Sequence, residues 1–228
     1  MSNKTKASKN IIIAIPKGRI LGDLKPLFSE IGFKPEADFY NDSSRKLIFD
    51  SNFPNLKIIK VRSFDVATIV KFGGADFGIC GSDVLEEFSS NDIYPMFDLE
   101  IGKCRLSIAT RKDNLLDGQN NDFSKVSHLR IATKYLSLTN NYFSARGIQA
   151  ECIKLNGAME LAPHLNLCDY IVDLVSTGNT LKENNLVEVK KILDVSSYLI
   201  VNRHSFKTKN DELLKFVKLF DTKKLITH

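Results

Sequence analysis

The 228-residue chain contains no tryptophan, no closely spaced pair of cysteines and no long apolar run. Its cysteines are Cys80, Cys104, Cys152 and Cys168. They form no C-x-x-C pair and have no histidine pattern near them, which argues against a zinc site. Their apolar neighbours indicate buried thiols in a reducing compartment. No apolar run approaches the roughly 20 residues of a membrane span, so we expect no membrane partner.

Other common signatures are absent as well. There is no Walker A loop, which argues against a P-loop nucleoside triphosphatase. No block of basic residues with interleaved aromatics is present, so the net charge of +5 does not indicate a nucleic-acid partner. Residues 1–10 are polar and lack the apolar core of a secretory signal, so we expect a frayed tail on a cytoplasmic protein. With 43% hydrophobic and 26% charged residues, the composition is that of a globular protein with a sizeable core.

Short apolar segments alternate with amphipathic ones from residue 11 onward. Strands are expected at 11–15, 47–50, 56–61, 76–80, 106–110, 131–133, 148–155, 170–175, 186–193 and 198–202. Helices are expected between 19 and 32, between 62 and 73, and at 84–88, 139–146, 158–165 and 211–220, with another beginning at 181–183. This alternation predicts parallel βαβ units and an α/β fold. The polar segment 111–127 is expected to cross between two lobes.

The stretch 169–181 carries the clearest candidate site. The expected strand at 170–175 runs directly into a turn of small and hydroxyl residues, after which a helix begins. Such a turn points several backbone N–H groups at one place, which favours an anion such as a phosphate. Asp173, near the strand end, can accept hydrogen bonds from vicinal hydroxyls of a sugar. An ordinary βα loop has a similar composition and stays open as an alternative. The turn residues are Ser176, Thr177, Gly178, Asn179 and Thr180.

Charged side chains near the ends of other expected strands form a second candidate set. In open α/β sheets, ligands bind at the carboxyl ends of the strands. Two cations after the 11–15 strand can hold a triphosphate or a pyrophosphate, although loop cations are also commonly just solvated. The later members of the set are explained equally well as helix caps or surface charges. The candidates are Lys17, Gly18, Arg19, Arg45, Arg62 and Asp83.

Five blocks of the chain resemble one protein family. They read NIIIAIPKGRIL at 10–21, GADFGICGSDVL at 74–85, LRIATKYLSLTNNYF at 129–143, IKLNGAMELAP at 153–163 and DYIVDLVSTGNTL at 169–181. Their residues, and their order over most of the chain, resemble ATP phosphoribosyltransferase, the first enzyme of histidine biosynthesis. Two departures are small. Ser82 stands where a basic residue is common, which weakens the case for a phosphate contact by that loop, and Asn179 occupies a variable position.

The resemblance implies a fold and a reaction. The fold is α/β, with two lobes of the periplasmic-binding-protein-like type and a central cleft. Lobe I comprises 11–105 and 187–228, lobe II comprises 106–186, and 1–10 is a flexible tail. The reaction transfers the phosphoribosyl group of 5-phosphoribosyl 1-diphosphate to N1 of ATP, giving phosphoribosyl-ATP and pyrophosphate. Its transition state has oxocarbenium character, so positioning and charge stabilisation supply most of the catalysis.

The resemblance also implies roles for the candidate residues. The phosphoribosyl-diphosphate site comprises Glu160, Asp173, Ser176, Thr177, Gly178, Asn179 and Thr180. The ATP and pyrophosphate site comprises Lys17, Gly18, Arg19, Arg45, Arg62 and Asp83. Mg²⁺ is carried by the substrate, with no protein metal ligand assigned. No residue is assigned as a general base, because N1 of adenine already has a lone pair, and His164 is interpreted as a helix-end histidine.

The chain stops at His228, shortly after the last expected helix, which leaves no room for the histidine-binding domain of the family's long form. The resemblance is thus to the short form, which implies a hetero-oligomer with a regulatory subunit similar to histidyl-tRNA synthetase. Two other classes stay open. A type I phosphoribosyltransferase has a similar loop, usually with two adjacent acids, whereas Leu174 follows Asp173 here. A two-lobed binding module without chemistry is the other, and lack of turnover would favour it.

Overall fold

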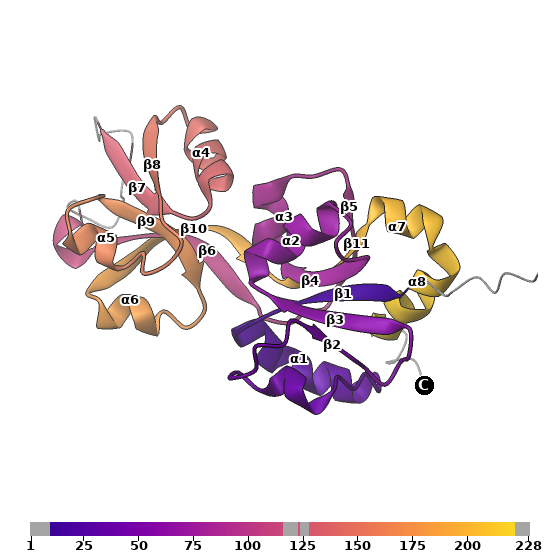
Figure 1. Ribbon diagram of the computed structural model, residues 1–228. Helices are drawn as coiled ribbons and strands as arrows, with labels where there is room; N and C mark the ends of the chain where they lie inside the picture. Colours follow the sequence, from indigo (N-terminus) through magenta and orange to yellow (C-terminus); the bar gives the residue numbers. More distant parts are fainter. Residues whose placement is uncertain (1–9, 116–122, 124–127, 222–228) are drawn as a thin grey trace, which may run out of the picture. The chain divides into compact units, whose positions relative to one another are not determined.

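The computed structural model describes residues 10–115, 123 and 128–221, which form two compact units. Unit 1 contains the described residues up to 85, together with 89–102 and those from 196 onward (Figure 1). Unit 2 contains 86–88 and the described residues of 103–195. The predicted α/β class with two units is confirmed. Within the described residues, no helix is both long enough and apolar enough to cross a membrane.

Unit 1 is built on a six-stranded mixed sheet. In spatial order its strands are β2 (Ile48–Phe49), β3 (Leu56–Val61), β1 (Ile11–Pro16), β4 (Phe77–Gly81), β11 (Ser197–Asn202) and β5 (Ile93–Asp98). The central strand β1 pairs in parallel with β3 and β4, whereas β2 and β11 run antiparallel to their neighbours. The carboxyl ends of β3, β1 and β4 therefore lie side by side.

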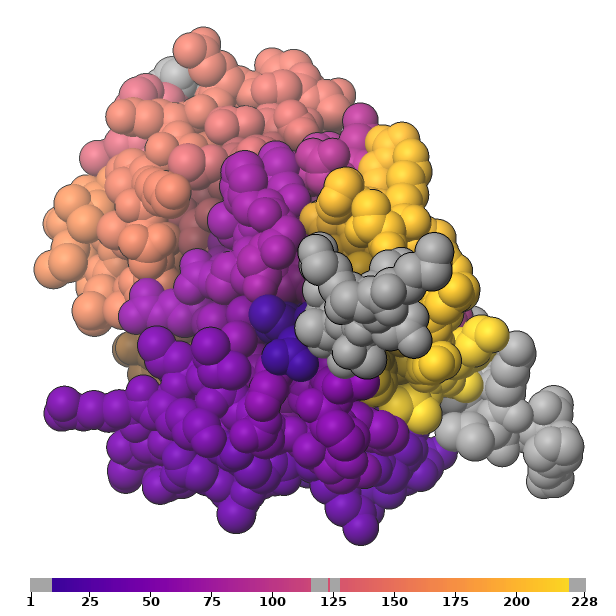
Figure 2. Space-filling view, turned by 45° about the vertical axis from the view of Figure 1, so that its right-hand side comes forward, coloured from indigo at the N-terminus to yellow at the C-terminus, as the bar shows by residue number. Residues whose placement is uncertain are grey.

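Helices pack on both faces of this sheet. They are α1 (Arg19–Glu30), α2 (Ser63–Lys71), α7 (Arg203–Thr208) and α8 (Asn210–Val217), with 3-10 turns η1 (Ala37–Tyr40) and η4 (Lys218–Phe220), while α3 (Ser82–Phe88) follows β4. Ile11, Ile13 and Ile15 join the apolar cluster of α1 and α8, because alternate side chains of a strand share a face. The space-filling view shows the yellow C-terminal segment of unit 1 against its purple N-terminal part (Figure 2).

The opposite face of the unit 1 sheet receives α2 at close range. A Cβ added at Gly78 in β4 would lie 2.9 Å from the carbonyl oxygen of Ala14 and 2.9 Å from Val66 Cγ1. Glycine at this position therefore lets α2 approach the sheet more closely than any side chain would allow. This packing holds the amino end of α2 next to the carboxyl end of β3.

Unit 2 has a five-stranded sheet. In spatial order its strands are β10 (Leu186–Val195), β6 (Cys104–Arg111), β9 (Tyr170–Val175), β7 (Leu129–Thr133) and β8 (Ala150–Lys154). Strand β7 pairs in parallel with β8 and β9, and β6 runs antiparallel to β9 and β10. The helices are α4 (Leu136–Ser144), α5 (Leu161–His164) and α6 (Asn179–Glu183), with the 3-10 turn η2 (Lys112–Asn114). Apolar residues of β6, β9, α5 and α6 form one core cluster.

Some elements differ from the sequence prediction. Strand β5 and helix α7 are missed, because Pro95 interrupts the apolar pattern of β5 and α7 is short and polar. The helix expected at 158–165 shortens to α5, since Ala158 has a left-handed φ of 52° that a right-handed helix does not accommodate. Both sheets are mixed rather than wholly parallel, because strands such as β11 return antiparallel.

The unit boundaries also differ from the expected 105/106 and 186/187. The chain enters unit 2 at Lys103, before the 111–127 segment that was expected to make the crossing, and it returns at Ser196. Strand β10 pairs with β6 over its whole length, so residues 187–195 belong to the unit 2 sheet. Within 111–127, residues 116–122 and 124–127 lie outside the described residues.

Candidate functional site

Unit 2 contains a cavity of about 150 Å³ around the carboxyl end of β9. Its wall comes from β6, β9, the turn after β9, α6 and the residue before α5. The lining residues are Ser107, Ala109, Glu160, Ile171, Asp173, Leu174, Val175, Ser176, Thr177, Gly178, Thr180 and Leu181. The structure thus brings together the predicted phosphoribosyl-diphosphate residues with one exception. Asn179 is the first residue of α6 and is exposed, outside the cavity wall.

The register of β6 against β9 explains most of this wall. Ser107 pairs with Asp173, and Ala109 pairs with Ile171. Directly opposed residues of antiparallel strands lie on the same face, so these four side chains form one surface. Ser107 is only 1% exposed, so its hydroxyl is buried between the apolar neighbours Leu106 and Ile108. Ser107 was not predicted as a site residue, although a serine between two apolar residues of an expected strand is a usable signal.

The turn after β9 depends on the backbone of Gly178. This residue has φ 81° and ψ 3°, the left-handed conformation that glycine adopts without steric cost. A Cβ at Gly178 would meet only Val175 Cγ1, at 3.9 Å, so conformation rather than space requires glycine. The Asn179 N–H lies 3.4 Å from Thr177 Oγ1. Within the described part of the chain, the N–H groups of Thr177 and Gly178 donate to no protein acceptor, so they are available to an anion.

Asp173 lies two residues before the end of β9 and keeps 27% of its side chain exposed. Its Oδ1 accepts a hydrogen bond from the Leu174 N–H at 2.8 Å. The Lys134 Nζ stands 3.9 Å from the same oxygen, and Lys134 directly follows β7, the parallel neighbour of β9. Lys134 was not predicted as a site residue, although it follows an expected strand just as Lys17 does. The site therefore combines a carboxylate with a nearby cation.

The two side chains flanking α5 have separate surroundings. Glu160 immediately precedes α5, is half-buried and lines the cavity. His164 is the last residue of α5, and its Nε2 donates to the carbonyl oxygen of Asn184 at 2.8 Å. The interpretation of His164 as a helix-end histidine is confirmed.

The predicted ATP residues lie in unit 1, at the carboxyl ends of three neighbouring strands. Lys17 and Gly18 link β1 to α1, and the Lys17 N–H donates to the carbonyl oxygen of Val61 at 2.8 Å. Arg62 directly follows β3 and is the N-cap residue of α2. These ends adjoin because β1 and β3 are parallel with Pro16 opposite Val61.

Two members of this set are more constrained than the others. Arg19 begins α1, and its Nη2 donates to the carbonyl oxygen of Gly102 at 3.3 Å. Asp83, in the first turn of α3, is only 4% exposed, so a ligand has little access to its carboxylate. The set therefore divides into accessible cations and one buried acid.

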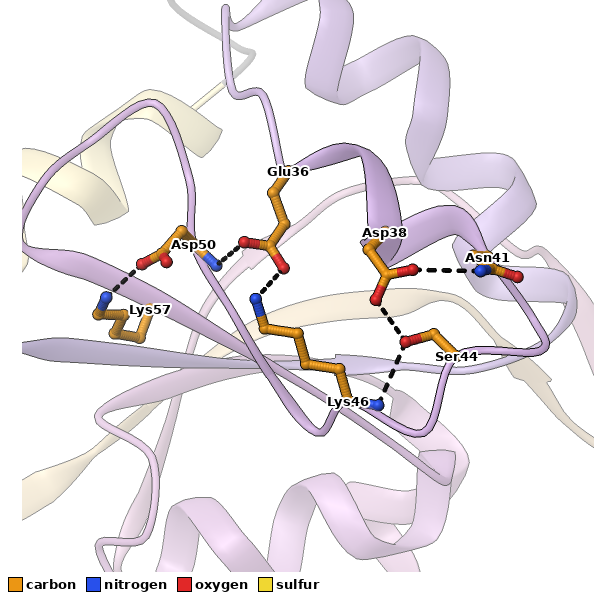
Figure 3. A network of polar contacts seen from close by, with 7 residues as sticks. All are labelled: Glu36, Asp38, Asn41, Ser44, Lys46, Asp50 and Lys57. Carbon is orange, nitrogen blue, oxygen red and sulfur yellow. Dashed lines mark hydrogen bonds and ion pairs between the residues drawn. The ribbon is translucent and has the colours of Figure 1, made fainter.

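Arg45 lies in the loop between η1 and β2, where both of its sequence neighbours are held by carboxylates (Figure 3). The Ser44 hydroxyl donates to Asp38, and the Lys46 ammonium pairs with Glu36. The Ser44 hydroxyl, followed by an Asn41 amide, lowers the pKa of Asp38. Strand β2 pairs antiparallel with β3, which brings this loop toward the carboxyl end of β3. The exposed Arg45 thus lies in a loop that two carboxylates hold in place.

The cysteines are all free thiols. Cys80 and Cys168 are buried as expected, whereas Cys104 and Cys152 are half-buried. Burial, and then the charge of Asp83, raises the pKa of the Cys80 thiol. Among the described residues, no group of three or more His, Cys, Asp or Glu side chains is arranged to hold a metal ion.

Fold and site together define a two-unit α/β protein in which one cavity combines a hydroxyl-rich turn with a carboxylate near the end of a strand. Comparison with known proteins identifies the family. A sequence model described as ATP phosphoribosyltransferase matches residues 62–222. The chain belongs to the ATP phosphoribosyltransferase family.

The chain and its relatives are similar over nearly their full lengths. It is 51% identical to an ATP phosphoribosyltransferase of Rhodospirillum rubrum over 92% of this chain and 91% of the relative. It is 53% identical to the enzyme of that name from Novosphingobium aromaticivorans, over 92% and 93%. Among solved structures, an ATP phosphoribosyl transferase (HisG:HisZ) complex from Thermotoga maritima matches with a TM-score of 0.74 and 31% identity, over 92% of this chain and 96% of that one.

Proposed function

We propose that the cavity of unit 2 binds 5-phosphoribosyl 1-diphosphate and that the carboxyl ends of β1 and β3 in unit 1 bind ATP. The chain is an ATP phosphoribosyltransferase, which transfers the phosphoribosyl group to N1 of ATP in the first step of histidine biosynthesis. The observation that carries the assignment of the site is the cavity that combines the turn after β9 with Asp173. The 5′-phosphate would lie against the N–H groups of Thr177 and Gly178 and against the hydroxyls of the turn.

Asp173 would accept hydrogen bonds from the two ribose hydroxyls. Its negative charge would also stabilise the positive charge that develops on the ribose ring as the bond to pyrophosphate breaks. Because the side chain is half-buried, this charge is screened less than one in open water. On the ATP side, Lys17, Arg19, Arg45 and Arg62 would hold phosphate oxygens, with the arginine forks giving direction as well as charge. Asp83 and Gly18 would shape the loops that carry these cations.

The residues of unit 2 fit a magnesium ion carried by the diphosphate. Mg²⁺ in nucleotide and phosphate sites commonly takes one or two carboxylates together with substrate phosphates. Two carboxylates line the cavity, Asp173 and Glu160, and no larger group of ligands is present among the described residues. When bound, Mg²⁺ would offset the charge of the leaving pyrophosphate.

The proposal includes a regulatory partner and a location. The matching Thermotoga maritima structure is titled as a HisG:HisZ complex, and this chain covers 96% of the chain it matches there. We infer that this chain also forms a hetero-oligomer with a regulatory subunit similar to histidyl-tRNA synthetase. The four free thiols support the reducing cytoplasm as its location.

The test is an absorbance assay of phosphoribosyl-ATP formation from ATP and 5-phosphoribosyl 1-diphosphate with Mg²⁺, run with and without the regulatory subunit. Asp173→Asn and Thr177→Val should raise KM for 5-phosphoribosyl 1-diphosphate by about 10- to 100-fold, since a charge-assisted hydrogen bond contributes about 1.5–3 kcal/mol. Asp113→Asn is the matched control, because Asp113 is an exposed carboxylate of the same unit that pairs with Arg111, away from the turn.

The outcomes distinguish an error in the placement of the site from an error in the proposed reaction. Unchanged kinetics in both cavity variants would refute the placement of the site. A folded chain that makes no product even with the regulatory subunit would instead favour a binding module without chemistry.

A further inference from the structure

Arg105 lies at the base of the turn that forms the cavity. It stands near the start of β6, where it pairs with Val175, the last residue of β9. From there its Nη1 donates a hydrogen bond to the carbonyl oxygen of Ser176 at 3.2 Å. Arg105 does not itself line the cavity. It therefore contacts the first residue of the turn from just outside the cavity, on the same face of β6 as Ser107.

Glu188 of β10 holds the Arg105 guanidinium in a fork. Its Oε1 accepts from Arg105 Nε at 2.6 Å, and its Oε2 accepts from Nη2 at 2.5 Å. The cavity residue Ser107 donates from its hydroxyl to Glu188 Oε1 at 2.8 Å. The fork raises the pKa of Arg105 and, with the Ser107 hydroxyl, lowers the pKa of Glu188. Three strands, β10, β6 and β9, thus contribute to one network.

This network constrains one peptide group of the turn. The carbonyl of Ser176 and the N–H of Thr177 belong to the same planar unit, and in a trans peptide they point in opposite directions. No cis peptide bond occurs among the described residues. A hydrogen bond that holds the Ser176 carbonyl toward Arg105 therefore turns the Thr177 N–H away from Arg105. Since Thr177 lines the cavity, the hydrogen bond between Arg105 and Ser176 sets the orientation of one donor in the cavity wall.

We propose that Arg105, held by Glu188 and Ser107, is a positioning residue that presets the turn for a phosphate group. The inference rests on the assignment of the cavity to 5-phosphoribosyl 1-diphosphate. Arg105 acts through the Ser176 carbonyl, because its Nη1 donates to that oxygen while Nε and Nη2 donate to Glu188, and Arg105 is not among the residues that line the cavity. A preset turn binds its anion without the cost of ordering loop residues on binding.

The variants that test this role keep charge or shape. Arg105→Lys retains the charge but cannot bond Glu188 and Ser176 with one rigid fork. Glu188→Gln retains the shape but loses the charge that holds the fork. Arg111→Lys is the matched control, because Arg111 ends the same strand and pairs with Asp113 at 3.0 Å, away from the turn.

The measurements are the dissociation constant of ribose 5-phosphate, a probe that carries the 5′-phosphate, and the KM values of both substrates. Arg105→Lys and Glu188→Gln should each raise the dissociation constant of ribose 5-phosphate and the KM for 5-phosphoribosyl 1-diphosphate by about tenfold. This is the scale of one charge-assisted hydrogen bond. KM for ATP and the values of Arg111→Lys should stay at the wild-type level. Combining Arg105→Lys with Thr177→Val should give less than the product of the single effects, because the hydroxyl and the backbone N–H of Thr177 would donate to the same phosphate group and both depend on the position of this one residue.

Two results would overturn the inference. One is ribose 5-phosphate affinity within twofold of wild type in Arg105→Lys and Glu188→Gln while Thr177→Val is weakened. The other is an equal loss of affinity for both substrates, which indicates general destabilisation. If Thr177→Val also binds ribose 5-phosphate normally, the assignment of the cavity itself fails. Should Arg105→Lys fail to fold, Glu188→Gln decides the question by the same measurements.

Discussion

Gly178→Ala tests the conformation on which the turn after β9 depends. Gly178 has φ 81°, and an added methyl group would meet only Val175 Cγ1, at 3.9 Å. The cost is therefore conformational, about 1–2 kcal/mol for a non-glycine residue in the left-handed region. A less flexible unfolded chain offsets about 0.4–1 kcal/mol of it. We expect the free energy of unfolding to fall by up to about 1.6 kcal/mol and KM for 5-phosphoribosyl 1-diphosphate to rise as the turn relaxes.

Gly157→Ala is the matched control for this measurement. Gly157 lies in the same unit, outside the left-handed region, with open space around its Cα. At Gly157 the alanine only reduces the conformational entropy of the unfolded chain. This variant should therefore be more stable than the wild type by about 0.4–1 kcal/mol. Denaturant unfolding of both variants isolates the left-handed cost as their difference. If the two variants are equally stable, the reasoning about Gly178 is refuted.

Two further predictions concern charged groups outside the turn. Arg45→Ala should raise KM for ATP about tenfold or more with KM for 5-phosphoribosyl 1-diphosphate unchanged, on the scale of one charge-assisted contact. Ser44→Ala, which frees the loop but keeps the guanidinium, should give a smaller rise, and equal effects on both substrates would contradict the assignment of Arg45. The lowered pKa of Glu188 means that its ionised form stabilises the fold. This contribution is present above the unfolded pKa of about 4.3 and is lost as the pH falls through the lowered pKa in the folded state. The excess stability of wild type over Glu188→Gln in denaturant unfolding should therefore be present at pH 6 and fade below about pH 4, whereas a pH-independent excess would exclude the ion pair as its source.

The strand with the most regular composition was the easiest to predict. The boundaries of β9 agree with the sequence prediction because its apolar run is continuous and a turn of polar residues closes it. Gly178 was placed correctly for a similar reason, since its turn is specified by neighbouring residues. Strand β5 was missed because its pairing with β11, more than 90 residues later, and not its own composition, makes it a strand.

The roles predicted for the cavity and for the unit 1 cations stay proposals, but the structure adds what no local pattern indicates. Ser107 and Glu188 are 81 residues apart, and their hydrogen bond exists only because β10 pairs with β6. The tie between Ser44 and Asp38 depends in the same way on the path of one loop. Such contacts have no sequence signature, because either side chain alone is an ordinary polar residue.

The sequence by itself determined the α/β class, the family, and the stretch with an acid before a hydroxyl-rich turn. These features are local, because strand composition, turn chemistry and residue order are all read along the chain. Only the tertiary structure decided that β10 belongs to unit 2, that Asp83 is buried, that Asn179 lies outside the cavity wall and that Arg105 donates a hydrogen bond to the carbonyl of Ser176. The physical reason is that strand pairing and register, which join residues far apart in the chain, determine which side chains share a face.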